Sequence, residues 1–254
     1  MKVVVHEQPE GMARAAAEAA AGILSEAVAR RGQAAFIAAT GTSQFDLLGH
    51  LVRLPGIAWE RTTLFHLDEY AGMPADHPAS FRRYLRERLT CKVPLGAVHF
   101  IAGDAPDLRA EIERLNGILA GTPIDVALVG IGENSHLAFN DPPADFQTET
   151  PYLVVNLDEA CRRQQLGEGW FASLDEVPRR AVSMSIRQIL KSASIICTVP
   201  ERRKARAVQA CLEGEIGPAV PASILRTHPR CSMFLDQEAA SLLHPATLAA
   251  TDIR

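Results

Sequence analysis

The sequence predicts an α/β fold in which helices flank a mostly parallel sheet. Short runs rich in β-branched residues alternate with longer stretches of helical periodicity, and this alternation is typical of βαβ units. A length of 254 residues suits one large α/β domain. No linker rich in proline, glycine and serine divides the chain, so we expect a single domain over residues 1–254.

The elements follow one another from the first residues. Residues 2–6 form a strand, and the alanine-rich stretch 12–30 has apolar side chains at helical spacing before Gly32, a residue type that often ends a helix. Residues 34–39 form the next strand. By the same criteria we expect further strands at 63–67, 98–101, 124–129, 152–156, 194–198 and 231–235, and further helices at 44–52, 80–88, 108–119, 186–191, 203–212 and 237–242.

Composition narrows the classes of function. The chain has 47% hydrophobic and 22% charged residues, which is typical of a globular protein. Its formal net charge of -4 provides no general positive field, so we expect no nucleic acid partner and a local site for any phosphate. We also expect no membrane association, since no apolar run is long enough to span a bilayer.

The cysteines and the N-terminus indicate a cytoplasmic protein. Five cysteines at wide, irregular spacing predict reduced thiols rather than a disulfide framework or a zinc module. The apolar run at residues 3–6 is too short for a signal peptide. We expect no metal and no cofactor, because ligand residues are not densely spaced and the glycine-rich loop at 130–135 lacks the third glycine of a dinucleotide fingerprint.

Candidate site residues follow the predicted strands, because ligands of open parallel sheets gather at the strands' carboxyl ends. The first segment there is the turn Thr40-Gly41-Thr42-Ser43 between a strand and a helix. Small residues allow backbone N–H groups and the helix N-terminus to hold a phosphate. The alternative is a plain turn in which Ser43 caps the helix.

The second segment places two carboxylates, Asp68 and Glu69, at the end of the strand 63–67. Neighbouring side chains of an extended backbone point to opposite sides, so one of the two can face a cleft. A carboxylate in that position suits enolisation, in which a general base takes a proton from one carbon and returns it to the next. A solvated acidic loop is the alternative.

The third segment, GIGENSHLAFNDP over residues 130–142, follows the strongly apolar strand 124–129. Its glycines permit a tight loop, histidine is a residue type suited to acid–base chemistry, and Asp141 is near enough in sequence to orient His136. A purely structural histidine is the alternative, although a polar loop after a buried strand favours a functional one.

Residues 161–177 (CRRQQLGEGWFASLDEV) interrupt the alternation of strands and helices. The segment is polar and carries two glycines, which is compatible with a mobile lid. An ordinary surface excursion is the alternative.

Together and in this order, the three segments resemble the glucosamine-6-phosphate deaminase/isomerase family, which shares its fold with 6-phosphogluconolactonases. The most specific matches are FHLDEY at residues 65–70 and the GIGENSHLAFNDP loop. The resemblance runs nearly end to end and includes Lys204, which follows the strand 194–198.

The resemblance implies a modified doubly wound fold and the conversion of glucosamine 6-phosphate to fructose 6-phosphate and ammonia. The pyranose opens, a proton moves between C2 and C1, and a carbinolamine loses ammonia. Asp68 matches the family's proton-transfer carboxylate and His136 the residue that assists ring opening. Asp141 takes the place of a glutamate that partners this histidine, and Asn134 that of an aspartate in some members. The positions expected to bind the substrate and its phosphate are Thr40, Gly41, Thr42, Glu69, Gly132 and Lys204.

Several positions depart from the family pattern. Thr40 replaces a glycine of the phosphate turn, and Asn134 alters the tuning of the histidine. Ser135 replaces a glycine, and its Cβ restricts backbone conformations with positive φ. Asp141 is one methylene shorter than glutamate, and a misplacement approaching an ångström can cost about 10²-fold in rate.

The lid and the activator site also differ from the family. The arginine that other members place in the lid to hold the phosphate has no clear match, with Arg162, Arg163 and Gln165 as candidates for its position. Allosteric members carry a serine and basic residues after the histidine loop, whereas this chain has PADFQTE at 143–149. We therefore expect no activation by N-acetylglucosamine 6-phosphate, and we favour a small assembly while leaving a homo-oligomer open.

Three alternative functions stay open. A lactonase of the same fold shares the turn and the histidine loop, but its acidic pair is followed by arginine, whereas Tyr70 follows Glu69 here. An enzyme for another amino-sugar phosphate, such as galactosamine 6-phosphate, is the second alternative, because the residues alone do not exclude it. A non-catalytic sugar-phosphate-binding protein is the third, although the strand at 2–6 leaves no room for an N-terminal helix-turn-helix.

Overall fold

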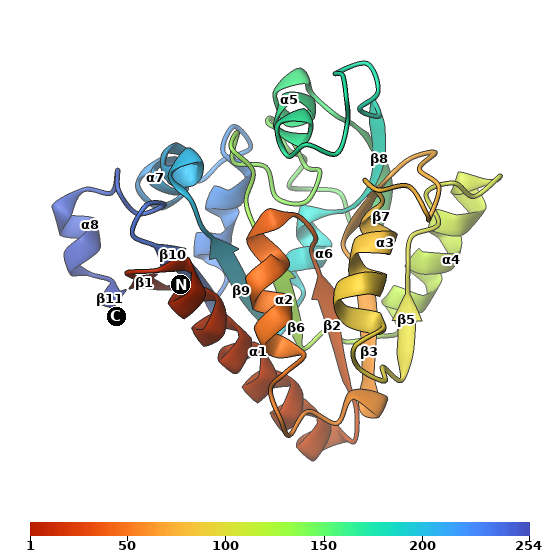
Figure 1. Cartoon of the computed structure of the whole chain (residues 1–254), viewed down its shortest axis with the longest axis horizontal. Helices are drawn as coiled ribbons and strands as arrows, with labels where there is room; N and C mark the ends of the chain where they lie inside the picture. Colours follow the sequence, from red (N-terminus) through yellow and green to blue (C-terminus); the bar gives the residue numbers. More distant parts are fainter.

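A computed structural model describes all 254 residues and confirms the α/β fold (Figure 1). Its main sheet has eight strands in the order β11-β1-β10-β9-β6-β2-β3-β5, and all neighbouring strands in it are parallel. These strands are β1 (Lys2–His6), β2 (Ala34–Ala38), β3 (Thr62–His66), β5 (Ala97–His99), β6 (Val126–Val129), β9 (Ser194–Val199), β10 (Cys231–Asp236) and β11 (Asp252–Ile253).

A second, antiparallel sheet has the order β4-β8-β7. It contains β4 (Asp68–Tyr70), β8 (Arg180–Met184) and β7 (Tyr152–Asn156). The strand predicted at 152–156 therefore forms with the predicted bounds, but it lies outside the parallel sheet. β4 and β8 were not predicted as strands, because their sequences, DEY and RAVSM, contain no run of β-branched residues.

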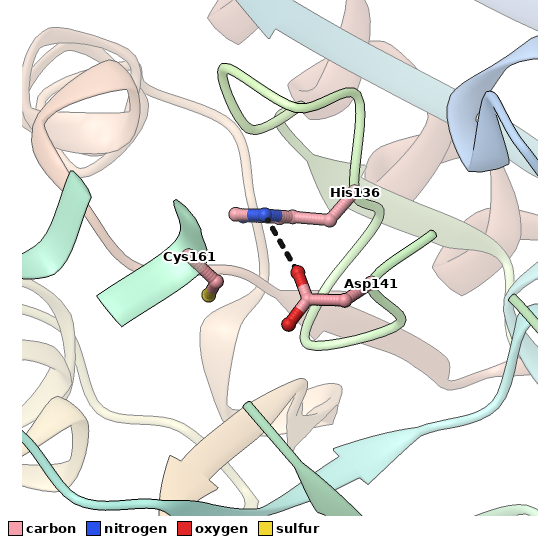
Figure 2. Close-up of side chains that lie close together, drawn as sticks. All are labelled: His136, Asp141 and Cys161. Carbon is pink, nitrogen blue, oxygen red and sulfur yellow. Dashed lines mark ion pairs between the residues drawn. The ribbon is translucent and has the colours of Figure 1, made fainter. Parts of the chain in front are cut away.

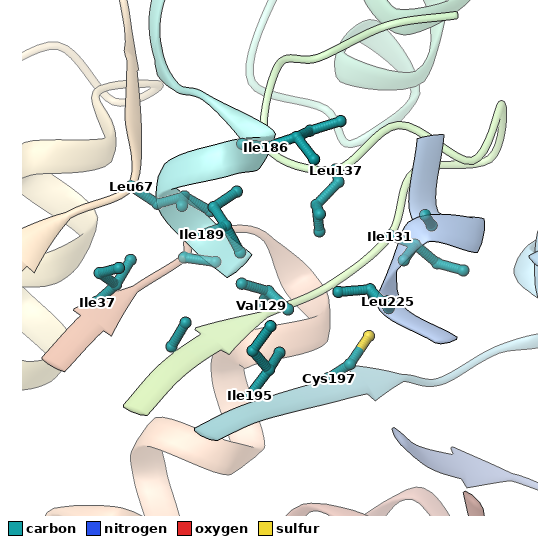
Figure 3. Packing of buried hydrophobic residues seen from close by; sticks show 14 of the residues in the cluster. Ile37, Leu67, Val129, Ile131, Leu137, Ile186, Ile189, Ile195, Cys197 and Leu225 are labelled. Atoms are coloured by element: carbon teal, nitrogen blue, oxygen red, sulfur yellow. The ribbon is translucent and has the colours of Figure 1, made fainter. Parts of the chain in front are cut away.

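Helices cover both faces of the main sheet, as Figure 1 shows with α1 and α2 in front and α6 behind. One layer contains α1 (Pro9–Arg31), α2 (Phe45–Leu51) and α3 (Phe81–Leu85), and the other contains α4 (Leu108–Ala120), α6 (Ile186–Leu190) and α7 (Ala205–Glu213). Successive residues of β2 face alternate layers: Phe36 and Ala38 pack against the first, Ile37 against the second. Figure 3 shows part of the second core, where Ile37, Val129 and Ile195 lie beneath α6. The sheet is thus buried on both faces, which is typical of a parallel sheet.

Most predicted helices form, with shifted ends. α1 ends where Gly32 adopts a left-handed backbone with φ 77°, as predicted. The segment 86–90 continues α3 as a π-helical turn, and a 3₁₀ turn at 202–204 precedes α7.

The helix expected at 237–242 is wrong, since that segment forms turns and α8 (Pro245–Ala249) follows it. The Asp236 carboxylate accepts a hydrogen bond from the Ala239 N–H at 2.7 Å. That bond has the geometry of a helix N-cap, but the N–H groups of Ser241 and Leu243 then bond to carbonyl groups only three residues back, so the segment forms turns and not an α-helix.

The segment 161–177 begins within α5 (Glu159–Gly167), which lies at the top of the view in Figure 1. Cys161, Phe171 and Val177 pack into a third, smaller core with Tyr70 and Phe139. The segment is therefore anchored at both ends, while Gly167, Gly169 and Trp170 between them are exposed. Its movement as a lid stays a prediction.

No helix in the structure combines the length and the apolar character needed to cross a bilayer.

Candidate active site

A cleft with an empty volume of about 550 Å³ lies where β2, β3, β6 and β9 end. All three candidate segments line it, although they are distant in sequence. The predicted residues that border the cleft are Thr40, Gly41, Thr42, Asp68, Gly132, His136 and Lys204. The parallel strands explain this convergence, because they deliver their following loops to one edge of the sheet.

The turn after β2 presents free backbone donors to the cleft. Gly41 has φ 96°, a conformation that favours glycine. The N–H groups of Thr40 and Gly41 donate to no acceptor in the protein. Tyr84 holds the turn from outside by donating its hydroxyl to the Gly41 carbonyl at 3.1 Å. Unsatisfied N–H groups beside a cleft are suited to an anion.

Lys204 contributes a positive charge to the lining of the cleft. Its side chain is buried, with an exposed fraction of 4%, and it forms no salt bridge. Burial lowers its pKa to about 8, and the positive charge of Arg203 contributes. A buried cation without a carboxylate partner favours the arrival of an anion from solution.

Asp68 begins β4 and faces the cleft. Its Oδ1 atom is buried without a hydrogen-bond partner. Burial raises the pKa of the Asp68 carboxyl to about 8, and the neighbouring charge of Glu69 contributes. A carboxyl group that titrates near neutrality can both accept and return a proton.

Glu69 does not line the cleft, which corrects its expected contact with the substrate. Its carboxylate is fully buried and accepts hydrogen bonds from the Ser80 hydroxyl at 2.8 Å and from the N–H groups of Arg82 at 2.9 Å and Phe81 at 3.2 Å. Glu69 therefore holds the N-terminus of α3. The alternation of side chains predicted that one of the two carboxylates faces a cleft, and the structure assigns that position to Asp68.

His136 and Asp141 face each other within the same loop (Figure 2). The distance from His136 Nδ1 to Asp141 Oδ1 is 3.3 Å. Burial alone would raise the pKa of Asp141, but His136 and the donors on Asn134 and Asp158 hold it below its usual value. Since Nδ1 faces the carboxylate, Nε2 is the ring nitrogen that remains for a substrate.

Asn134 forms hydrogen bonds to both His136 and the Asp141 carboxylate. Its Nδ2 atom donates to Asp141 Oδ1 at 3.1 Å, and its Oδ1 atom accepts the N–H of His136 at 3.2 Å. Asn134 and Asp141 lie behind His136 rather than in the cleft wall. Both residues thus position the histidine.

The backbone of this loop depends on two special positions. A Cβ atom on Gly132 would lie 2.2 Å from His136 Cε1, so only glycine leaves room for the imidazole ring. Ser135 adopts φ 68°, a conformation that favours glycine. The loop therefore keeps this left-handed backbone despite the serine, at the cost of some strain.

Cys161 lies beside the histidine pair and completes a group of three potential metal ligands (Figure 2). The ligand atoms of His136, Asp141 and Cys161 lie within 4.8 Å of one another. Burial raises the pKa of the Cys161 thiol far above its usual value, and the charge of Asp141 contributes. Because a metal binds the thiolate, we interpret this thiol as a protonated neighbour of Asp141.

The segment 161–177 provides no arginine to the cleft. Arg162 is turned away and donates to the carbonyl groups of Leu174 and Val177. Arg163 pairs with Glu159 on the surface. Gln165 does line the cleft, and its Oε1 atom accepts the Tyr70 hydroxyl at 2.6 Å.

Four further residues line the cleft although the sequence did not single them out as site residues. They are Gln164, Glu168, Phe81 and Phe139. No sequence signal distinguishes them, because similar polar and aromatic residues occur elsewhere on the surface and in the core.

Comparisons with known proteins give the same family as the motifs. The family model described as glucosamine-6-phosphate isomerases/6-phosphogluconolactonase matches residues 7–233. The chain belongs to this family. Among curated proteins, it is 33% identical over 246 residues to a glucosamine-6-phosphate deaminase of Bacillus cytotoxicus, which covers 97% of this chain and 90% of the relative. A deaminase of Bacillus anthracis matches to the same extent.

Solved structures show the same relationship. A structure described as a monomeric glucosamine-6-phosphate deaminase superimposes with a TM-score of 0.86 at 33% identity, covering 95% of this chain and all of that one. A 6-phosphogluconolactonase from Trypanosoma brucei superimposes with a TM-score of 0.77 at 18% identity, covering 96% of this chain and 98% of that one. The lactonase likeness shows the shared fold alone.

Proposed function

We propose that this chain converts glucosamine 6-phosphate to fructose 6-phosphate and ammonia. The observation that supports this most strongly is the placement of a buried, unpartnered Asp68 carboxylate opposite a histidine held by Asp141, in one cleft with a phosphate turn. Deaminases at 33% identity over nearly the whole chain support the same reaction.

The phosphate binds first in this account. It accepts hydrogen bonds from the free N–H groups of Thr40 and Gly41 and pairs with the buried ammonium of Lys204. A dianion offsets the cost of burying that charge. Binding energy at the phosphate then holds the sugar near Asp68 and His136.

Ring opening follows at His136. Its Nε2 atom takes the proton of the anomeric hydroxyl, which gives a charged imidazolium, and then delivers that proton to the ring oxygen as the C1–O5 bond breaks, which leaves the open-chain aldehyde. Asp141 keeps the Nδ1 side of the imidazole oriented and stabilises the charged ring when it forms. Asn134 acts through both of these residues.

Asp68 performs the isomerisation. The ionised carboxylate removes the proton from C2 of the open-chain sugar, and the protonated carboxyl returns it to C1. Water adds to the resulting imine carbon at C2, and the carbinolamine then collapses to the ketone and releases ammonia. The raised pKa suits this double role, because both protonation states are accessible near neutral pH.

The segment 143–149 stands where allosteric family members bind an activator, and the charge of its Glu149 is balanced by two nearby cations. Glu149 pairs with Lys191 at 2.8 Å and with Arg187 at 3.3 Å. Both cations are thereby occupied, which supports the proposal that N-acetylglucosamine 6-phosphate does not activate the enzyme. The cytoplasmic location, the absence of a nucleic acid partner and the open question of a homo-oligomer stay predictions.

The test is the release of ammonia from glucosamine 6-phosphate by the purified protein without added metal. Galactosamine 6-phosphate and 6-phosphogluconolactone are assayed in parallel. We expect ammonia and fructose 6-phosphate from the first substrate. Activity on one of the other two alone would assign the cleft a different reaction, and inactivity on all three would favour a binding protein.

A further inference from the structure

A second cation lies beside the phosphate turn but outside the cleft wall. Arg203 precedes Lys204 in the chain, and its Nη2 atom donates to Thr42 Oγ1 at 3.0 Å. Thr42 itself lines the cleft. The guanidinium is therefore one hydrogen bond away from the surface at which a phosphate binds, and about a third of its side chain is exposed, at 32%.

Two carboxylates hold this guanidinium in a fixed place. Arg203 Nη1 donates to Glu133 Oε1 at 3.0 Å, and its Nε donates to Glu201 Oε2 at 2.6 Å. A guanidinium has five N–H donors. The bonds to Glu133, Glu201 and Thr42 use three of them, so two N–H donors remain free. Arg203 can thus bind another anion without releasing either carboxylate.

Arg162 and Arg163, the candidate arginines of the segment 161–177, do not line the cleft. Arg162 is buried and bonded to two carbonyl groups, and Arg163 is bonded to Glu159 on the surface. Lys204 is the one lysine or arginine that lines the cleft. A phosphate dianion carries up to two charges, and one ammonium acts on it only as a point charge.

We propose that Arg203 binds the substrate's phosphate together with Lys204, exchanging its bond to Thr42 for a bond to a phosphate oxygen. The inference rests on the proposed function for the identity of the substrate, but not for the binding of phosphate. A planar guanidinium adds directional hydrogen bonds that an ammonium does not provide. Burial is the main reason why the pKa of Lys204 is lowered, and the charge of Arg203 lowers it further, so a dianion bound by both cations would stabilise the charged lysine.

The binding of inorganic phosphate, measured by isothermal titration calorimetry on the whole protein, tests this directly. Arg203→Gln removes the charge and retains a polar side chain. We expect its dissociation constant for phosphate to rise about 10- to 100-fold, as for the loss of a charge-assisted hydrogen bond. Arg203→Lys should recover part of the affinity. Arg202→Gln is the matched control, because Arg202 is exposed and lies 3.7 Å from Glu238, and its affinity should be unchanged.

Glu133→Gln separates direct binding from support of the loop. It removes the ion pair with Arg203 and leaves the guanidinium in the protein. If Arg203 only braced the loop, Glu133→Gln would weaken phosphate binding as much as Arg203→Gln does, and the inference would be overturned. Equal affinity of Arg203→Gln and the wild type, or no phosphate binding by the wild type, would overturn it as well.

Turnover of glucosamine 6-phosphate provides the second readout. Arg203→Gln should raise KM about 10-fold or more and change kcat less, because the phosphate does not react. If the wild type releases no ammonia but its phosphate affinity depends on Arg203, the proposed function fails and this inference stands. If the wild type releases ammonia but Arg203→Gln binds phosphate as tightly as the wild type does, this inference fails and the proposed function stands.

Discussion

Oδ1 of Asp141 lies 3.3 Å from Nδ1 of His136, although aspartate is one methylene shorter than the glutamate expected at this position. The shorter side chain reaches the histidine because Asn134 Nδ2 and the Asp158 N–H also donate to its carboxylate, at 3.1 and 3.0 Å. The hydrogen bonds around Asp141 therefore compensate for its shorter side chain and keep the carboxylate near His136.

Asp141→Asn should lower kcat by about 10²-fold without unfolding the protein. The amide is the same size as the carboxylate but no longer stabilises a charged imidazole, and it can favour the wrong tautomer of His136. Steady-state turnover of glucosamine 6-phosphate measures the loss, and circular dichroism controls for folding. Turnover within twofold of the wild type would remove Asp141 from the account of ring opening.

The pH dependence of kcat/KM should report Asp68. The carboxyl must be ionised to remove the C2 proton, and its pKa is about 8 in the free enzyme. We therefore expect kcat/KM to rise with pH, about tenfold per unit at its steepest, up to about pH 8, and to fall above it because Lys204, whose pKa is also about 8, loses the charge that binds the phosphate. A profile that is already level at pH 6 would contradict the raised pKa.

The same carboxyl should couple folding to pH. Its pKa is higher in the folded state, near 8, than the value of 3.8 expected in the unfolded chain, so the folded state binds the proton more tightly. The resulting stability is present at low pH and is lost as pH rises between these two values. Asp68→Asn has no such proton, so its Tm relative to the wild type should increase from pH 4 to pH 8 and then level off. A difference in Tm that is constant with pH would contradict the coupling.

Gly132→Ala should damage turnover through His136 alone. The added Cβ would lie 2.2 Å from the imidazole, so the ring must move, and a misplacement of about 1 Å can cost about 10²-fold in rate. Gly117→Ala in α4 is the control, because its Cβ meets no atom within 4 Å. Similar activity of the two variants would show that the position of the ring is not limiting.

Ser135→Gly should stabilise the protein. The left-handed backbone at φ 68° costs a serine on the order of 1 kcal/mol more than a glycine, and the Ser135 hydroxyl makes no hydrogen bond that would be lost. Part of this gain is offset by the greater flexibility of glycine in the unfolded chain. We expect Tm to rise by about 1–3 °C in thermal unfolding. A lower Tm would show that the hydroxyl or the Cβ contributes contacts that outweigh the strain.

Local patterns predicted the parts of the fold that depend on local chemistry. β1 and β7 have the predicted bounds, and α1 ends at Gly32 as expected, because alternation and a left-handed glycine are properties of short segments. The partner of β7 was not predictable, since a β-branched run specifies a strand and not the strand beside it. β4 and β8 were missed because their short sequences, DEY and RAVSM, carry no β-branched run.

For the site, the sequence likewise predicted which loops take part but not how each side chain is oriented. The three loops at the strands' ends were found, because their residue types and order in the chain carry the signal. Which of Asp68 and Glu69 faces the cleft depended on the position of Ser80 and α3, about a dozen residues away. The hydrogen bond from Arg162 to the Val177 carbonyl likewise joins residues that come together only in the folded chain, so the sequence did not show it.

The most direct test compares ammonia release from glucosamine 6-phosphate by the wild type with that by Asp68→Asn. The proposed mechanism predicts that the wild type releases ammonia and fructose 6-phosphate in equal amounts, and that Asp68→Asn retains phosphate binding but releases neither product. Ammonia release by Asp68→Asn at a rate near that of the wild type would contradict it.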